Sequence, residues 1–225
     1  MVANSNCWLK DRCNCKDCDT FCVRLFKLDK LYELALVPLH QRKHIKFVLD
    51  SNGTDRDEYI KLKNISEDIE NFVKNGKNLY IHSTSCGNGK TSWALRMIQS
   101  YLNAIWYKTT IKCRALFIHV PTFLLSLKDN ISVKNNYIEH IKQNVMECDL
   151  IVWDELGTKT TTQFEMENLL SIINTRLTNN KSNIYTSNLS GEELQEKIGD
   201  RLYSRIINLS EEVELFGCDK RGLLS

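Results

Sequence analysis

The chain has 225 residues, with 30 Lys or Arg against 28 Asp or Glu, so its formal net charge is +2. Hydrophobic residues make up 42% of it, and two prolines and nine glycines exclude a collagen-like or disordered chain. A membrane span needs about 18 consecutive apolar residues, and a signal peptide needs an apolar stretch near the N-terminus. The sequence has neither pattern, so we expect a soluble cytoplasmic protein.

The charges are spread evenly along the chain. Residues 1–50 hold nine basic and six acidic side chains, which leaves 21 basic and 22 acidic side chains for residues 51–225. Neither part has the strong positive charge that is typical of a protein that binds nucleic acid over much of its surface. Any contact with DNA is therefore expected to be local and sensitive to salt.

Five of the nine cysteines lie within residues 7–22, at Cys7, Cys13, Cys15, Cys18 and Cys22. An odd total and a reducing cytoplasm argue against a framework of disulfides. Four thiolates satisfy a tetrahedral zinc ion, and Cys15 and Cys18 have the spacing of a zinc knuckle. The sequence predicts that four of the five hold Zn²⁺ and leaves open which one is spare. The alternative, five free thiols, would be a redox liability.

In chain order, the sequence first predicts a helix over residues 21–36, which Pro38 ends, and after a link over 40–58 a second helix over 65–73. We place a domain boundary near residue 50, between a zinc-binding module of residues 1–50 and a larger domain of residues 51–225. Short apolar runs that read as strands then alternate with segments of helical length: Leu79–His82, Ala115–Val120, Leu150–Trp153, Asn183–Thr186 and a candidate fifth, Val213–Phe216. This alternation predicts an α/β domain with a parallel sheet covered by helices, and ligands at the carboxyl ends of the strands.

A phosphate-binding loop follows the first of these strands. Residues 84–91 read TSCGNGKT, and a helical stretch follows them. In such a strand, loop and helix, backbone N–H groups surround phosphate oxygens, Lys90 contacts the β- and γ-phosphates, and Thr91 binds Mg²⁺. The residues expected to bind ATP or ADP are Cys86, Gly87, Asn88, Gly89, Lys90, Thr91 and Ser92. Thr84 stands where the P-loop pattern has glycine, which a β-branched residue replaces poorly if φ must be positive.

Two adjacent carboxylates end the strand predicted over residues 150–153. Asp154 is suited to the Mg²⁺ site, and Glu155 is suited to polarise the water that attacks the γ-phosphate. Asn188 follows the next strand and has an amide that can orient the same water. Together with the loop, the two carboxylates indicate a P-loop protein that hydrolyses ATP, because a simple kinase has no need of a water-activating glutamate.

These segments resemble the AAA+ ATPases of the DnaC/DnaI-type helicase loader family, in the form carried by phages and prophages of Gram-positive bacteria and within the IstB-like superfamily. The resemblance covers residues 31–225 and is carried by residues 79–94, FIHVPTFLLSLK at 117–128, LIVWDELG at 150–157, IINTR at 172–176, IYTSNLSGEEL at 184–194 and GDRLYSRI at 199–206. It implies an AAA+ P-loop ATPase fold with Asn188 as sensor 1, Arg205 as arginine finger and Arg221 as a nucleotide-contacting sensor 2. Because the chain ends soon after Arg221, we expect no helical lid. Thr84 departs from the commonest motif, which affects the expected hydrolysis rate more than nucleotide binding.

The resemblance implies an ATP-dependent loader that places a hexameric replicative helicase on single-stranded DNA in the bacterial cytoplasm. It also implies that the N-terminal zinc module docks on the helicase and that ATP promotes self-association. Two alternatives stay open. One is a low-turnover nucleotide-binding regulator of a helicase or loader, and the other is a transposition helper ATPase, which is similar in the same segments.

Overall fold

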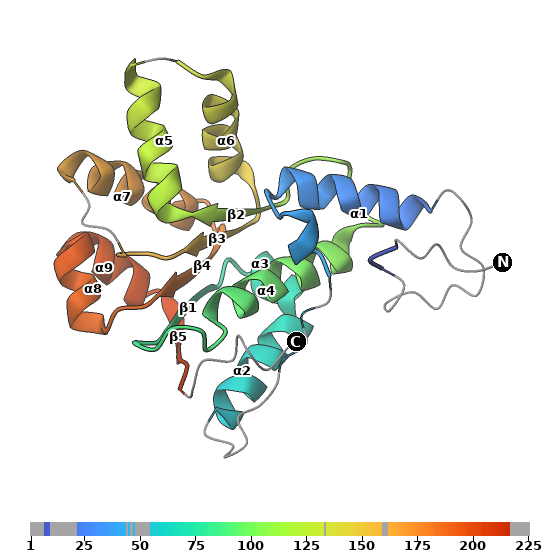
Figure 1. Ribbon diagram of the computed structural model, residues 1–225, viewed down its shortest axis with the longest axis horizontal. Helices are drawn as coiled ribbons and strands as arrows, with labels where there is room; N and C mark the ends of the chain where they lie inside the picture. Colours follow the sequence, from blue (N-terminus) through green and yellow to red (C-terminus); the bar gives the residue numbers. More distant parts are fainter. Residues whose placement is uncertain are drawn as a thin grey trace.

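The structure is a computed structural model, and it describes residues 7–9, 22–43, 45, 47, 55–132, 134–158 and 162–216. In this part of the chain, five parallel strands form one sheet in the order β2-β3-β4-β1-β5 (Figure 1). The strands are β1 (Asn78–His82), β2 (Ala115–His119), β3 (Leu150–Asp154), β4 (Ser182–Ser187) and β5 (Ser210–Glu214). The four strands predicted with most support are therefore confirmed.

The fifth strand begins three residues earlier than its apolar run indicated. Among the described strands, β5 pairs with β1 alone and forms an edge of the sheet, and Glu211, Glu212 and Glu214 on it are exposed. Charged side chains on an edge strand keep its open side from pairing with other chains. This is why a polar segment, which does not look like a buried strand, extends the sheet here.

The side chains of the strands point alternately to the two faces of the sheet, and each face has its own hydrophobic core. Leu79, Ile81 and Val152 pack into the first, and Tyr80, Ile151 and Trp153 pack into the second. Helices cover both faces because a parallel sheet needs a crossover between successive strands. Figure 1 shows α1 to α4 gathered on one side of the sheet and α5 to α9 on the other.

The first face carries α1 (Val23–Leu34), the short 3₁₀ helix η2 (Leu39–Gln41), α2 (Arg56–Glu67), α3 (Ile69–Lys74) and α4 (Lys90–Ile105). The helix predicted over residues 65–73 is in fact the end of α2 and the whole of α3, which meet at Asp68. Sequence periodicity missed the start of α2 because Leu62 and Ser66 are its only buried residues. The link predicted over residues 40–58 is therefore shorter than expected.

α1 packs on the sheet domain. Leu28, Leu31 and Tyr32 lie in the same core as Leu79, and the carbonyl of Ala35 accepts a hydrogen bond from the N–H of Phe117 on β2. This helix therefore contributes to the core beside α4. The division of the chain near residue 50 stays a prediction.

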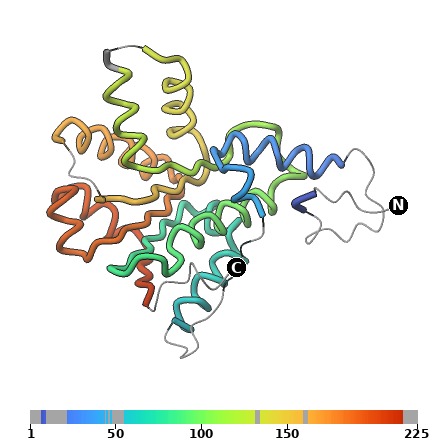
Figure 2. The backbone as a smooth tube through the Cα atoms, in the orientation of Figure 1, coloured from blue at the N-terminus to red at the C-terminus, as the bar shows by residue number. Residues whose placement is uncertain are grey.

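The second face carries α5 (Val120–Ser132), α6 (Asn136–Glu147), α7 (Gln163–Thr178), α8 (Gly191–Ile198) and α9 (Asp200–Ile207). α5 and α6 run side by side as a helical hairpin, which the backbone trace shows most clearly (Figure 2). Capping boxes begin α7 at Thr162 and α8 at Ser190, where Glu165 and Glu193 complete the reciprocal hydrogen bonds.

Arg176 of α7 is completely buried beneath the sheet. Its guanidinium donates to the carbonyls of Val145 (2.6 Å), Cys148 (3.0 Å) and Ser182 (2.7 Å), and to Oδ1 of Asn183 (2.8 Å). A buried charge is tolerated only with such partners. Arg176 therefore ties α6, α7 and the start of β4 together and has a structural role. None of the described helices is long and apolar enough to cross a membrane.

Candidate functional site

The loop after β1 has the backbone shape that phosphate binding requires. Gly87 and Gly89 have φ angles of 78° and 104°, a region that only glycine enters readily, and Gly89 caps α4 at Lys90. The free N–H groups and positive end of α4 therefore open directly into the loop. Thr84 is exposed and is not among the residues with positive φ, so threonine is tolerated at this position.

Lys90 is buried within the loop and hydrogen-bonded to it. Its ammonium donates to the carbonyls of Ser83 (3.3 Å) and Ser85 (2.7 Å) and to Oδ1 of Asn88 (3.1 Å). The amide of Asn88 in turn donates to Oγ of Ser83 and to the carbonyl of Leu215 (3.1 Å). The loop is thus held between the ends of β1 and β5, with a positive charge at its centre.

A carboxylate from β3 meets a hydroxyl from the loop. Oδ1 of Asp154 accepts hydrogen bonds from Oγ1 of Thr91 (3.0 Å) and from Oγ1 of Thr186 (2.7 Å), and Asp154 is only 4% exposed. Burial raises the pKa of Asp154, while the two hydroxyls partly offset this effect. Carboxylate and hydroxyl oxygens are ligands that suit Mg²⁺, and a cation here would favour the ionised form of Asp154.

Glu155 has a strained backbone and a specific side-chain partner. Its φ of 62° is unusual for a residue with a Cβ, and its N–H donates to Oγ1 of Thr186 (3.1 Å). Its carboxylate lies 3.0 Å from Nε2 of His119, whose Nδ1 lies 2.7 Å from Oγ1 of Thr122. The end of β2 therefore holds the carboxylate that β3 delivers.

A cavity of about 130 Å³ brings most of the predicted nucleotide-site residues together. Its lining consists of Gly87, Asn88, Gly89, Lys90, Thr91, Ser92, Glu155, Thr186, Ser187 and Asn188. Its volume suits phosphate groups better than a whole nucleotide. The loop, the oxygen donors of Thr91 and Asp154, and the carboxylate of Glu155 fit the phosphates of a magnesium-bound nucleotide.

Three predicted nucleotide-site residues that the structure describes do not line this cavity: Asp154, which contacts it through Thr91 and Thr186, and Cys86 and Arg205. Cys86 is exposed on the loop but does not line the cavity. Arg205 is exposed near the end of α9 and does not line it either. Arg221 lies outside the described residues, so its predicted contact with nucleotide stays a prediction.

The structure describes only two of the five N-terminal cysteines, Cys7 and Cys22. Cys7 is buried and packs in the apolar core, whereas Sγ of Cys22 accepts a hydrogen bond from the N–H of Leu25 (3.4 Å) at the start of α1. Cys13, Cys15 and Cys18 lie outside the described residues. Among the described residues, no group of three or more His, Cys, Asp or Glu side chains could hold a metal ion.

Sequence reasoning missed His119 and the role of Thr186. His119 stands opposite Asp154 in the pairing of β2 with β3, and Thr186 binds both Asp154 and the backbone of Glu155. A signal was available for both, because each is a polar residue at the carboxyl end of an apolar strand. The order of the strands, which a sequence pattern does not give, decides which ends meet.

A family model described as IstB-like ATP binding protein matches residues 27–215. No curated protein matches the chain significantly. Among solved structures, the fold is similar to that of the DnaC helicase loader, with 21% identity, a TM-score of 0.60, and coverage of 76% of this chain and 94% of that one. It is similar to DnaI, with 19% identity, a TM-score of 0.60, and coverage of 80% and 94%. It is also similar to AMPPCP-bound DnaA from Aquifex aeolicus, with 20% identity, a TM-score of 0.56, and coverage of 75% and 48%.

Proposed function

The chain belongs to the family of IstB-like ATP-binding proteins, and from this premise we propose that it is an ATPase that loads a replicative helicase onto single-stranded DNA. The observation that carries the proposal is the meeting of the phosphate loop, Glu155 and Asn188 around one cavity, with Asp154 hydrogen-bonded to Thr91 in its wall. The similarity of its fold to DnaC and DnaI, one described as a helicase loader, supports the choice of partner.

In this proposal the charged and polar side chains in and around the cavity have defined tasks. Lys90 neutralises the β- and γ-phosphates, and Thr91 and Asp154 hold Mg²⁺, which offsets the charge of the phosphates. Glu155 accepts a proton from the attacking water, and Asn188 orients that water. His119 positions the carboxylate of Glu155.

Arg205 is proposed to act on the nucleotide of a neighbouring subunit. It is exposed on α9 and does not line the cavity of its own chain, which is the placement that action in trans requires. ATP then favours assembly, because the neighbour's arginine completes the site, and hydrolysis releases the contact.

The substitution Arg205→Ala is expected to leave ATP affinity near normal and to lower partner-stimulated hydrolysis by about 10³-fold, the lower end of the effect of an arginine finger. ATP-dependent oligomers should disappear in analytical ultracentrifugation. Mixing Arg205→Ala with Lys90→Ala subunits should restore some hydrolysis, since each supplies what the other lacks. Arg201→Ala, an exposed arginine on the same helix, is the control. Loss of ATP affinity in Arg205→Ala, with no rescue on mixing, would show that its role is structural.

The loader function itself is tested by transfer of a purified replicative helicase onto a single-stranded DNA circle. The proposal predicts that the chain captures the helicase and that transfer requires ATP and Glu155. Capture and inhibition of the helicase without turnover would instead identify a regulator. Binding of a transposase and duplex DNA would identify a transposition helper.

We further propose that residues 1–50 hold one zinc ion through Cys13, Cys15, Cys18 and Cys22 and dock on the helicase. Cys7 is the spare cysteine in this proposal, because its side chain packs in the apolar core. Cys22 is kept as a ligand, since its Sγ lies at the N-terminus of α1, where it accepts a hydrogen bond from the N–H of Leu25, rather than in the apolar core.

Elemental analysis of the purified chain should find about one equivalent of zinc. Cys18→Ser should lose it, and Cys7→Ala, the matched control, should retain it. Absence of zinc from the wild-type chain, or its loss in Cys7→Ala alone, would refute this ligand set.

A further inference from the structure

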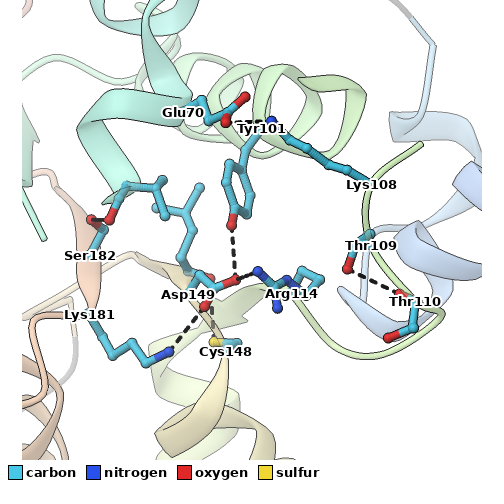
Figure 3. A network of polar contacts seen from close by, with 12 residues as sticks. Glu70, Tyr101, Lys108, Thr109, Thr110, Arg114, Cys148, Asp149, Lys181 and Ser182 are labelled. Carbon is cyan, nitrogen blue, oxygen red and sulfur yellow. Dashed lines mark hydrogen bonds and ion pairs between the residues drawn. The ribbon is translucent and has the colours of Figure 1, made fainter. Parts of the chain in front are cut away.

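A second and larger cavity lies at the amino ends of the strands, whereas the phosphate loop lies at their carboxyl ends. Its volume is about 630 Å³, and it shares no lining residue with the nucleotide cavity. Arg114, Asp149 and Lys181 directly precede β2, β3 and β4, which are neighbours in the sheet, so the topology brings them together (Figure 3). Residues of α3, the last part of α4, the loop between α4 and β2, and the turn between α7 and β4 form the rest of the wall.

The cavity concentrates positive charge. Five of the 30 basic residues of the chain line it but only two of the 28 acidic ones, so its net charge is +3 while the rest of the chain sums to −1. The basic residues are Lys74, Lys108, Lys112, Arg114 and Lys181. A hollow lined by one sign of charge focuses the field on ligands of the opposite sign.

Both carboxylates of the cavity are already neutralised. Asp149 accepts from Arg114 (2.6 Å), Lys181 (3.0 Å) and the hydroxyl of Tyr101 (2.9 Å), and Glu70 pairs with Lys108 (Figure 3). Asp149 thus fixes two cations in place and leaves one of the two charges uncompensated.

Lys74 and Lys112 have no ion-pair partner in the described part of the chain. Both are exposed. Their ammonium groups therefore give the cavity spare N–H donors as well as spare charge, and both suit the oxygens of phosphate groups.

An exposed aromatic residue next to the cavity favours single-stranded nucleic acid over a small anion as its ligand. Tyr107 is 65% exposed, and the ammonium of Lys108 lies 5.5 Å from the centre of its ring. Proteins that bind single-stranded nucleic acid combine a positively charged groove for the backbone with aromatic rings on which unpaired bases stack. Cations on several loops also exceed what one small anion needs.

We propose that this cavity binds the phosphate backbone of single-stranded nucleic acid, with Tyr107 stacking on a base. This inference rests on the proposed function in one respect, namely that the protein meets single-stranded DNA. It places the contact with DNA at the amino ends of the strands, away from the ATP site at their carboxyl ends. A nucleic-acid strand bound in this cavity leaves the phosphate loop free to bind ATP.

The test is fluorescence anisotropy of a labelled oligothymidylate of about 20 nucleotides with the full chain and Mg–ATP, from about 50 to 200 mM KCl. The double variant Lys74→Ala/Lys112→Ala removes two charges from exposed positions. It should lower the slope of log K against log salt by about 1.4, since each phosphate contact with a single strand contributes about 0.7. Tyr107→Leu should weaken binding by roughly tenfold at constant slope.

The double variant Lys30→Ala/Lys63→Ala is the matched control, because it removes two exposed lysines, from α1 and α2, that do not line the cavity. An equal loss in the control, or no binding by the wild-type chain, would overturn the proposal. Displacement of the oligonucleotide by millimolar pyrophosphate, with no effect of Tyr107→Leu, would overturn it in favour of a small-anion site.

Binding of a fluorescent ATP analogue separates this proposal from the proposed function. The Lys74→Ala/Lys112→Ala variant should bind the analogue as wild type does. If it also binds the oligonucleotide as wild type does, the position of the DNA contact is wrong while the ATPase assignment stands.

Discussion

Replacing Lys90 by alanine is expected to weaken ATP binding by about 100-fold or more, since charge-assisted hydrogen bonds contribute about 1.5 to 3 kcal/mol each. Its ammonium lies at the centre of the phosphate loop, next to the start of α4. A fluorescent ATP analogue, titrated with and without Mg²⁺, measures the change. Unchanged affinity would mean that the phosphate site is wrongly assigned.

Two controls separate charge from loop structure in this experiment. Lys77→Ala removes an exposed lysine just before β1 and should bind ATP normally. Lys90 also donates hydrogen bonds to the carbonyls of Ser83 and Ser85. The thermal unfolding of Lys90→Ala without nucleotide is therefore measured as the second control. An unfolding temperature close to that of wild type, together with lost ATP binding, would assign the effect to the missing charge.

Replacing Glu155 by glutamine should preserve ATP binding and lower hydrolysis by about 10² to 10⁴-fold, the usual contribution of a general base. Glutamine keeps the shape of the side chain and can still bond to His119, so the strained backbone at this residue is unaffected. Only the ability to take a proton from water is lost. Steady-state release of phosphate, compared with affinity for the ATP analogue, separates the two effects.

Glu167→Gln on the exposed face of α7 is the control for this change, because it makes the same substitution away from the cavity. Normal turnover in Glu155→Gln would contradict the assignment of Glu155 as the base. Loss of ATP binding in Glu155→Gln would mean that the carboxylate supports the loop rather than the reaction.

Much of the candidate nucleotide site could be predicted from the sequence because its parts are local. Gly87, Gly89, Lys90 and Thr91 occupy one short segment between a strand and a helix, where a phosphate-binding backbone depends on neighbouring residues. The adjacent pair Asp154 and Glu155 ends an apolar run, and a parallel sheet delivers such ends to one edge.

The parts that could not be predicted depend on contacts between distant segments. The hydrogen bond from Thr186 to Asp154 joins residues 32 positions apart, and that between His119 and Glu155 joins residues 36 apart. The burial of Arg176 depends on carbonyls from two other segments. The basic cavity could not be predicted from the sequence either, because its cations come from α3 and from separate segments that meet only after β2, β3 and β4 pair.

The concern about Thr84 shows how a pattern can mislead even within the local part. The sequence motif places glycine at this position, which suggested a need for positive φ. In the structure, the positive φ angles of the loop fall on Gly87 and Gly89 instead. The loop therefore takes its shape from these two glycines and from the contacts of Asn88 with Ser83 and Leu215.

The central claim is that the cavity between the phosphate loop and the end of β3 holds the phosphates of ATP. A crystal structure of the chain with Mg²⁺ and a non-hydrolysable ATP analogue tests it most directly. The account predicts the β- and γ-phosphates in this cavity, Lys90 in contact with their oxygens, and Mg²⁺ beside Thr91 and Asp154. An analogue bound elsewhere, for example in the basic cavity at the amino ends of the strands, would contradict it.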